Sequence, residues 1–440
     1  MKNYTLLTLI LLSLNVNANY FELFGTHVTT SGIGNQPNLN PNDAANNYYI
    51  PAQMALSDTF NFAASASMVK TDFESISGIV TKNDAYQDPA LNEEIGSVST
   101  DYDPSFQGSL HISLPLAKNM GVIALSVSTP FGKLMETNSG NPILPEYVMY
   151  RSRNNRSIFY LNYAKSFIDN TLAFSIGTQL GFQAAADVNT QVSIQSNFGS
   201  YGAAKSEIKP TLGVILSALY KPTEMSQAYF SFQQEMKNNL DANAFGKVSI
   251  STTTDYILDL NISSMIYYDP HIMRLGYGHE LGLLRVYGLL EYQMWGSYKA
   301  PLVHIAKKGG GIQPSSDFES LKTQNIFVPK LGMGILISDS FELDFGVIHK
   351  PTPIKGDFSG AGNTLDTSST ILTTAGLLDV DLFGHAIGLG AALQYHMLKE
   401  VKVTKTPGLE NGSVGNKIGS PGYTIGGSIV VASVGMNISF

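Results

Sequence analysis

The stretch Ala432-Ser-Val-Gly-Met-Asn-Ile-Ser-Phe440 alternates apolar residues with small or polar ones at a period of two. Alternate side chains of a β-strand point to opposite faces, so this pattern is typical of a strand with one apolar and one wet face. The even positions form the apolar face, and they are Ala432, Val434, Met436, Ile438 and Phe440. The stretch therefore predicts a strand in the wall of a β-barrel or at the surface of a sheet.

The same alternation recurs along most of the chain. It predicts roughly fourteen strands, each about as long as a strand that crosses a bilayer at a 45° tilt. The clear segments are 59–70, 106–116, 120–131, 155–167, 172–183, 211–220, 227–236, 284–298, 324–338, 341–347, 383–397 and 432–440, with weaker ones at 248–280 and 398–405. We expect an all-β chain.

Long polar connections alternate with tight joins between these strands. The long ones are 71–104, 132–154, 184–207, 299–323, 351–380 and 406–424, and the tight ones include 117–119, 168–170 and 338–340. Outer-membrane barrels have long loops outside and short turns in the periplasm. The asymmetry thus also predicts the direction of the strands.

Composition favours an exported membrane barrel. Residues 1–18 read as a secretory signal, with Lys2, an apolar core from Leu6 to Leu14 and the small-residue pattern Val16-Asn17-Ala18. No later run reaches the roughly 18 apolar residues that a spanning helix needs. The chain has 440 residues, no Cys and only 14% charged residues, and its net charge of -8 argues against binding to nucleic acid.

A soluble β-sandwich would also alternate, because it buries one face of each sheet. Charged residues on the polar parity, such as Arg285 and Asp344, suit a wet lumen as well as a solvated sheet face. The low charge and the aromatic Phe440 favour the membrane barrel. Phe440 is similar to the signal that outer-membrane barrels present to the barrel-assembly machinery, so we expect that machinery as a partner.

Residues 19–58 lack the alternation and precede the first expected strand. Asn42 or Asp43 can cap one short helix, and Pro51 suits the first turn of another. A barrel of about fourteen strands is wider than the eight-stranded kind that side chains fill alone. We therefore expect this segment to plug the lumen.

The motif in this segment resembles the hatch of the outer-membrane FadL/TodX family, which transports long-chain fatty acids and other hydrophobic compounds. The resemblance rests on Asp43-Ala44-Ala45 and on Pro51-Ala52 followed by Met54-Ala55, and Ile50 stands where the family usually has Asn. It implies a transmembrane antiparallel barrel with a partly helical N-terminal hatch. The implied division is a signal peptide at 1–18, a hatch at 19–58 and a barrel at 59–440, in the outer membrane of a Gram-negative bacterium.

The resemblance also implies uptake by ligand binding and rearrangement of the hatch. Release would then go sideways into the membrane through a kink in the third strand, here 121–131. Pro115 and Pro130 lack ladder donors and mark either bulges or plain strand ends. The aromatic residues of 292–298 suit a girdle at the membrane interface.

Candidate contact residues come from the hatch and from the few cations. Each hatch side chain either packs the plug or contacts ligand, and the set is Tyr20, Phe21, Leu23, Phe24, Asp43, Tyr49, Ile50, Pro51 and Ala52. The candidates for binding a carboxylate are Arg151, Arg153, Arg156 and Arg285. These arginines suit contacts with lipopolysaccharide and other outer-membrane lipid, or with acids such as Glu291, better than they suit a carboxylate site.

Other function classes find less support in the sequence. There is no Gly-x-Ser-x-Gly and no His-x-x-x-His pair, and His111 suits a hydrogen-bonding role in the wall better than that of a base. We expect no enzyme activity, no cofactor and no metal site. The alternative to a hydrophobic-compound transporter is a general or ion-selective porin, which would narrow its pore with a loop instead of a hatch.

Overall fold

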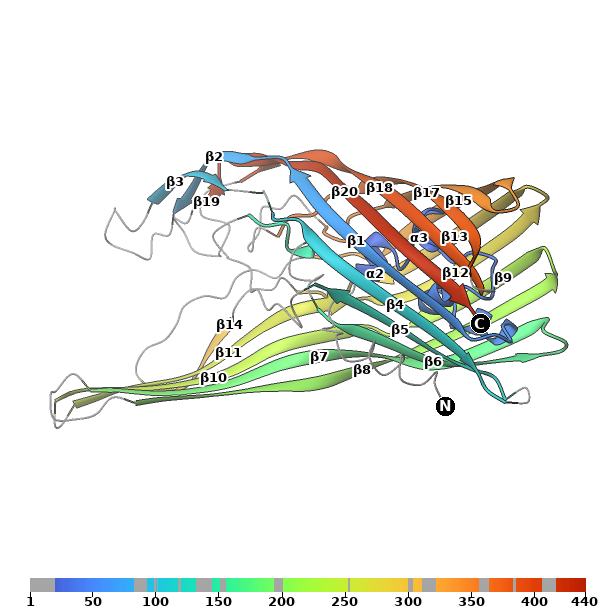
Figure 1. The fold of residues 1–440 in the computed structure, drawn as a ribbon. Helices are drawn as coiled ribbons and strands as arrows, with labels where there is room; N and C mark the ends of the chain where they lie inside the picture. Colours follow the sequence, from blue (N-terminus) through green and yellow to red (C-terminus); the bar gives the residue numbers. More distant parts are fainter. Residues whose placement is uncertain are drawn as a thin grey trace.

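The computed structural model describes residues 20–82, 93–98, 100, 102–117, 120–131, 145–150, 156–193, 201–251, 254–299, 304–310, 322–355, 364–382, 385–405 and 417–440. Within them, fourteen strands form a closed antiparallel barrel (Figure 1). In ring order these are β1 (Asn61–Phe73), β4 (Ser105–Pro115), β5 (Val122–Pro130), β6 (Ile158–Phe167), β7 (Leu172–Ser193), β8 (Tyr201–Thr223), β9 (Ser226–Gln233), β12 (His271–Leu281), β13 (Leu284–Met294), β15 (Ile326–Ser338), β16 (Phe341–Lys350), β17 (Ser369–Leu382), β18 (His385–Thr404) and β20 (Gly422–Ser439). β20 pairs with β1 from Asn61↔Ser439 to Phe73↔Gly427, which closes the ring.

The alternation read from the sequence separates the two faces of the wall. In β20, Val434 is 60% exposed on the outer face whereas Ser433 is 6% exposed on the inner one. In β4, Phe106 is 51% exposed and Gln107 only 1%. An apolar exterior and a polar interior are what a barrel in lipid requires. The predicted fold class is confirmed.

The tight joins gather at one end of the barrel, where the C-terminus also lies (Figure 1). Ile168, Asp169 and Asn170 turn the chain between β6 and β7 with φ of 53°, 49° and 65°. In outer-membrane barrels the end with short turns faces the periplasm. We call it the periplasmic end.

Three sequence expectations about the wall are wrong. Residues 351–380 were expected to form a loop but contain most of β17, and 398–405 belongs to β18 instead of forming a strand of its own. β17 shows no simple alternation because apolar and polar residues are mixed on both of its faces: Ile371 is 3% exposed toward the interior, and Leu372 is 49% exposed toward the outside. The third error concerns 184–207, where most of the expected loop is strand.

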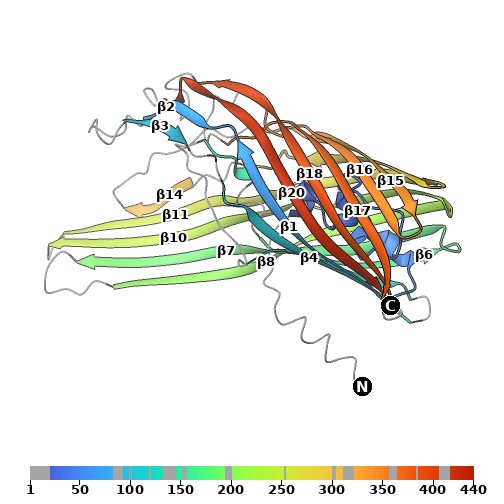
Figure 2. The same ribbon diagram turned by 45° about the horizontal axis from the view of Figure 1, so that its top comes forward.

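That strand belongs to arms that extend far beyond the ring on the side opposite the periplasmic end (Figure 2). β7 and β8 have 22 and 23 residues, whereas about 9–11 residues cross a bilayer. They continue beside β10 (Met236–Ser251), β11 (Thr254–Asp269) and β14 (His304–Gly310), and β10 runs parallel to β7. At the same end a small sheet joins β2 (Ile76–Lys82), β3 (Glu93–Val98) and β19 (Lys417–Ser420).

Residues 20–58, which we call the N-terminal segment, lie inside the ring (Figure 1). The segment forms α2 (Tyr20–Phe24), α3 (Val28–Ser31) and the 3₁₀ helices η1 (Ala44–Tyr48) and η2 (Pro51–Leu56). Asp43 caps η1 through Ala45 N, and Pro51 begins η2, both as predicted. No helix in the described part of the chain has the length and apolarity needed to span a membrane.

Candidate functional site

The N-terminal segment is hydrogen-bonded to strands on several sides of the lumen. Asn47 donates to Ser126 Oγ of β5 (2.9 Å) and accepts from Asn162 Nδ2 of β6 (2.9 Å). Across the ring, Gln394 of β18 donates to the carbonyl of Phe24 (2.6 Å), and Thr373 of β17 donates to that of Gly32 (2.7 Å). Anchors on opposite walls hold the segment across the lumen.

Two further anchors use backbone groups of the segment. The Thr26 carbonyl accepts from Ser109 Oγ (2.6 Å) and lies 3.2 Å from His111 Nε2, both on β4. The Ala52 amide donates to Ser217 Oγ of β8 (2.8 Å). His111 therefore has the wall role that its parity predicted.

A buried cluster of three charges supports the segment from the wall. Arg274 of β12, Glu291 of β13 and Lys330 of β15 are 1%, 1% and 3% exposed. Glu291 Oε2 lies 2.9 Å from Arg274 Nε and 3.3 Å from Lys330 Nζ. Gln293 also donates to Glu291 Oε1 (2.5 Å). We call Arg274, Glu291 and Lys330 the charge cluster.

Both cations of the charge cluster also bond the N-terminal segment. Arg274 Nη2 donates to the Tyr48 hydroxyl (3.1 Å), and Lys330 Nζ donates to the carbonyl of Asn35 (3.1 Å). The segment itself has no Lys or Arg, so these contacts depend on cations from the wall. Burial raises the pKa of the Tyr48 and Tyr49 hydroxyls, which are therefore neutral beside Arg274.

An aromatic cluster joins the segment to the wall. Tyr48 meets Phe21 edge-on at a centroid distance of 5.3 Å and Tyr160 of β6 at 5.0 Å, and Phe21 stacks on Tyr160 at 5.8 Å. Such pairs contribute about 0.5–1.5 kcal/mol beyond the area that they bury. The three side chains are 1%, 2% and 0% exposed, so the cluster packs the segment against the wall.

The predicted hatch residues lie against the wall. Tyr20 begins α2, and the others are buried: Phe21, Leu23, Phe24, Asp43, Tyr49, Ile50, Pro51 and Ala52. Ile50 packs among Ala173, Leu219, Tyr229 and Leu289, so an apolar side chain suits this seat. Their contacts within the described residues are packing contacts and hydrogen bonds of the segment.

The predicted arginines do not form one site. Arg151 and Arg153 lie outside the described residues. Arg156 is buried beside Asp269 as an ion pair, with its guanidinium 3.5 Å from the ring centroid of Tyr267. Arg285 lies at the periplasmic end, 2.7 Å from Glu342 and 3.3 Å from Glu280.

Arg274 and Lys330 were not predicted from the sequence as charged residues of the lumen. The available signal was parity: Arg274 shares its face with Ile272, which is fully buried, whereas Leu275 is 63% exposed to the outside. Trp295 and Tyr298 were expected at the membrane interface, but they are 0% and 7% exposed and pack on Tyr268 inside the wall. The indole N–H donates to Gln293, and this polar partner explains the inward position.

A second aromatic group lies at the end of the lumen opposite the periplasmic end. Phe73 of β1 stacks on Tyr147 at 4.0 Å, next to η3 (Val148–Tyr150). Tyr147 is held by both the N–H and the C=O of Gly426 (2.8 and 3.1 Å), and Tyr150 donates to Asp366 (3.0 Å). Residues 145–150 thus fold against the end of β1, against Gly426 of β20 and against Asp366, which precedes β17.

The third strand of the ring, β5, is paired without interruption on both sides. It pairs with β4 from Gln107↔Pro130 to Pro115↔Val122 and with β6 from Val122↔Ala164 to Ser128↔Ile158. Pro115 and Pro130 are the last residues of β4 and β5, so they mark plain strand ends and not bulges. No kink opens the wall along these pairs.

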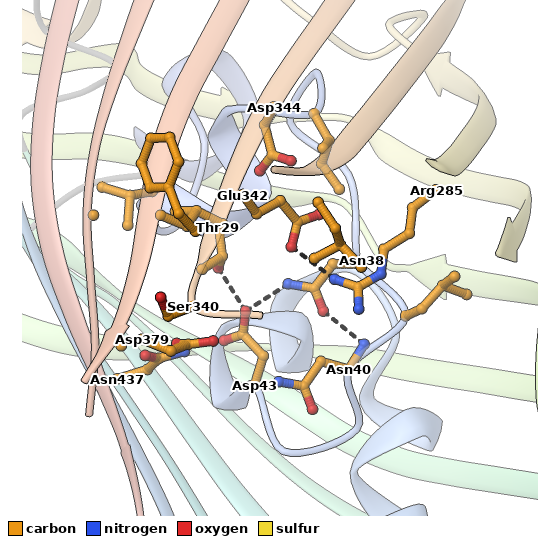
Figure 3. Close-up of a pocket in the computed structure, with 18 of the residues that line it drawn as sticks. Thr29, Asn38, Asn40, Asp43, Arg285, Ser340, Glu342, Asp344, Asp379 and Asn437 are labelled. Carbon is orange, nitrogen blue, oxygen red and sulfur yellow. Dashed lines mark hydrogen bonds and ion pairs between the residues drawn. The ribbon is translucent and has the colours of Figure 1, made fainter. Parts of the chain in front are cut away.

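A cavity of about 650 Å³ lies at the periplasmic end between the N-terminal segment and the wall (Figure 3). Asn38, Asn40 and Asp43 of the segment line one side, and the wall strands line the other. Asp43 accepts from Thr29 (2.5 Å) and Asn38 (2.6 Å), so it holds the segment's own fold together. Carboxyl groups of β16 and β17 face the same space.

Comparison with known proteins shows the fold. No model of a known protein family matches the chain, and no curated protein matches its sequence. Among solved structures, a FadL homologue from Pseudomonas aeruginosa is similar with a TM-score of 0.60 at 14% identity, covering 94% of this chain and 98% of that one. The toluene transporter TodX from P. putida has a TM-score of 0.54 at 14% identity, with 95% and 99% covered.

A third similar structure is the toluene transporter TbuX from Ralstonia pickettii, with a TM-score of 0.51 at 11% identity, covering 96% of this chain and all of that one. All three similarities cover nearly the whole chain. The chain thus has the fold of the FadL/TodX outer-membrane barrels, as the hatch motif had indicated.

Proposed function

We propose that this protein is an outer-membrane channel that takes up small hydrophobic molecules, such as long-chain fatty acids or hydrocarbons. The observation that carries the proposal is the N-terminal segment, which fills the lumen and is bonded to β5, β6, β8, β17 and β18. A general porin needs an open aqueous path, and a lumen filled in this way is poorly suited to one. The similar structures are transporters of toluene or a FadL homologue, which supports a hydrophobic cargo.

The two aromatic groups support a route for such a cargo. In the proposal, the cargo first meets the buried Phe73 and Tyr147 pair at the outer mouth. It then meets the buried cluster of Phe21, Tyr48 and Tyr160 deeper in the lumen, and it reaches their apolar surface by parting these side chains. Each methylene that leaves water gains about 0.8 kcal/mol, so apolar surfaces in series favour stepwise binding of an alkyl or aromatic molecule. In the proposal, residues 19–58 act as the hatch, 59–440 as the barrel and 1–18 as the export signal.

Passage requires the hatch to move, because it occupies the lumen. We infer that ligand binding at the deeper aromatic cluster shifts the segment by displacing Phe21 or Tyr48 from its seat. Lateral release into the membrane is the expected exit for an apolar molecule, since it avoids periplasmic water. Because β5 is fully paired with β4 and β6, such release would need these pairs to part after the hatch has moved.

Two measurements test this function against the porin alternative. Mass spectrometry of the purified protein should detect a co-purified fatty acid or other hydrophobic compound. In planar bilayers the intact protein should conduct little, and a variant lacking residues 20–58 should show a large steady conductance. A large conductance of the intact protein, without bound hydrophobic compound, would establish the porin instead.

A further inference from the structure

Four consecutive turns at the periplasmic end have a large apolar residue at the tip. They are Met120 between β4 and β5, Ile168 between β6 and β7, Met225 between β8 and β9 and Leu283 between β12 and β13, and they are 59%, 68%, 57% and 70% exposed. These strands are neighbours in the ring, so the four tips follow one another along one side of it. Turns that face water usually consist of Gly, Asn, Asp or Ser. We call these four residues the apolar rim.

Ile168 is the most informative residue of the apolar rim. Its φ is 53°, in the left-handed region, and Asp169 and Asn170 after it also have positive φ. Asp and Asn tolerate this conformation, whereas a β-branched residue rarely adopts it. Ile168 therefore has an unfavourable backbone conformation, and its apolar side chain is exposed instead of buried by the described part of the chain. A contact outside the chain would account for an Ile at this position.

The apolar rim continues the face of the wall that contacts lipid. Phe167 and Phe174, beside Ile168, are half-exposed on the outer face of β6 and β7, with their ring centroids 6.0 Å apart. Leu281 lies on the outer face at the end of β12, two residues before Leu283, and is also half-exposed. The apolar exterior of the barrel therefore passes from the wall onto the tips of the turns.

Two polar groups beside the apolar rim are arranged as at a boundary between lipid and water. The Tyr163 hydroxyl, on the outer face of β6, donates to the carbonyl of Met120 (2.6 Å), while the Tyr163 ring is partly exposed. Lys165, on the same face, has its ammonium group 5.8 Å from the ring centroid of Phe167. At membrane interfaces Tyr and Lys place an apolar body against lipid and a polar tip at the headgroups. The partner that fits the rim is therefore the periplasmic leaflet, whose phosphate groups suit Lys165.

The periplasmic end is not apolar all the way round. The next turn along the ring, between β15 and β16, is Ser338-Asp339-Ser340, and all three residues are exposed. Such residues are typical of a turn in water. The two sides of the same end of the barrel thus suit different surroundings.

We propose that the apolar rim inserts into the periplasmic leaflet of the outer membrane, at the boundary between headgroups and acyl chains, while the β15–β16 turn stays in water. Apolar surfaces that lie in this boundary are typically buried by about 5–10 Å. The insertion sets the depth and the tilt of the barrel. A periplasmic protein could also cover the rim, but it would not explain why the apolar surface continues from the lipid-facing wall. The proposal concerns the outside of the barrel and does not depend on what passes through the lumen.

The test measures whether each turn lies in lipid or in water. Because the chain has no Cys, the single variants Ile168→Cys, Met225→Cys and Ser340→Cys can each be labelled with one nitrobenzoxadiazole group and placed in phospholipid nanodiscs, which leave both membrane faces open. Iodide in the water should quench the labels at 168 and 225 at least about threefold less than the label at 340. A lipid with a nitroxide near its headgroup should quench them in the reverse order. Equal iodide quenching at all three positions would overturn the proposal, whether the labels were all exposed or all shielded.

A second comparison tests whether the apolar side chains hold the turns in the lipid. Ile168→Gly with Met225→Gly removes two of them, and Gly fits the left-handed backbone at 168, so the barrel should still fold and resist detergent on an unheated gel. A label at Met120→Cys should become at least about twofold more accessible to iodide in this background. The control, Ser338→Gly with Ser340→Gly, should leave that label unchanged. Unchanged quenching at Met120→Cys in the Ile168 and Met225 double variant would refute the role of the rim.

Discussion

Replacing Glu291 by Gln should release the N-terminal segment from the lumen. Glu291 is the only acid of the charge cluster, and Arg274 and Lys330 are 1% and 3% exposed on either side of it. Removing one partner of a buried ion pair costs about 3–5 kcal/mol, because the remaining charges stay buried without compensation. Here two like charges would remain, and both of them bond the segment directly through Tyr48 and Asn35.

Undocking the segment would let water reach both cations, so the penalty falls on the docked state. A loss of 3–5 kcal/mol corresponds to a population of the undocked state that is roughly 10²- to 10³·⁵-fold higher. Hydrogen–deuterium exchange measures this, because amides of residues 20–58 that exchange through undocking should exchange faster by the same factor. Amides of β15 and β16 should keep their protection.

Glu207→Gln is the matched control. Glu207 also lies beside two cations, Lys205 and Lys209, but on an exposed arm with 40% of its side chain accessible. Exposed pairs contribute about 0–1 kcal/mol, so exchange in residues 20–58 should not change. A triple variant, Arg274→Met with Glu291→Leu and Lys330→Met, should restore much of the protection because it removes all three charges of the charge cluster.

The reasoning would be refuted if Glu291→Gln left exchange of residues 20–58 within about threefold of the wild type. It would also be refuted if the triple variant exchanged as fast as Glu291→Gln, since the effect would then come from shape and not from charge.

Three further predictions concern the seat of the segment. Ile50→Asn introduces the residue usual in the FadL/TodX family and would bury an amide among apolar side chains. It should lower the free energy of opening η2 by about 1–3 kcal/mol. Unchanged hydrogen exchange at residues 51–56 would contradict this. Asp43→Ala removes the cap of η1 and should cost about 1 kcal/mol or more, seen as faster exchange at 44–48 than in an Asp58→Ala control. Burial beside His111 lowers the pKa of His27 despite nearby Asp43, so the released segment binds a proton more readily than the docked one. The docking equilibrium should therefore weaken as the pH falls below about 6.5, by at most tenfold per pH unit. Conductance should rise in this pH range in the wild type but not in His27→Gln.

Much of the barrel could be predicted because lipid imposes a local rule on every strand. Val434 and Phe106 face outward, whereas their sequence neighbours Ser433 and Gln107 face inward. This alternation between adjacent residues can be read from the sequence without knowledge of the tertiary structure. The caps at Asp43 and Pro51 are equally local, and they predicted η1 and η2. The rule failed for β17, where Ala375 and Leu377 on the inner face pack with Val28 of the N-terminal segment.

The candidate site was less predictable because it depends on which strands are neighbours. Arg274, Glu291 and Lys330 are far apart in sequence, and only the pairing of β12 with β13 and of β13 with β15 brings them together. Likewise the inward position of Trp295 follows from its hydrogen bond to Gln293 and its packing on Tyr268. The aromatic residue types of 292–298 alone suggest a membrane interface instead. The long arms escaped prediction because their residues lie outside the lipid, where the alternation is no longer required.

Movement of the N-terminal segment is the central claim, and a disulfide that locks the segment to the wall tests it most directly. The chain has no Cys, so Ala52→Cys with Ser217→Cys would form a unique bond where the Ala52 amide lies 2.8 Å from Ser217 Oγ. The control is Ser175→Cys with Ser217→Cys, which joins two directly paired wall residues and leaves the segment free. Uptake of labelled toluene or oleate by cells should fall to background in the oxidised segment-to-wall variant, recover on reduction and stay at the wild-type rate in the wall-to-wall control. Uptake at the wild-type rate with the segment locked to the wall would contradict the account.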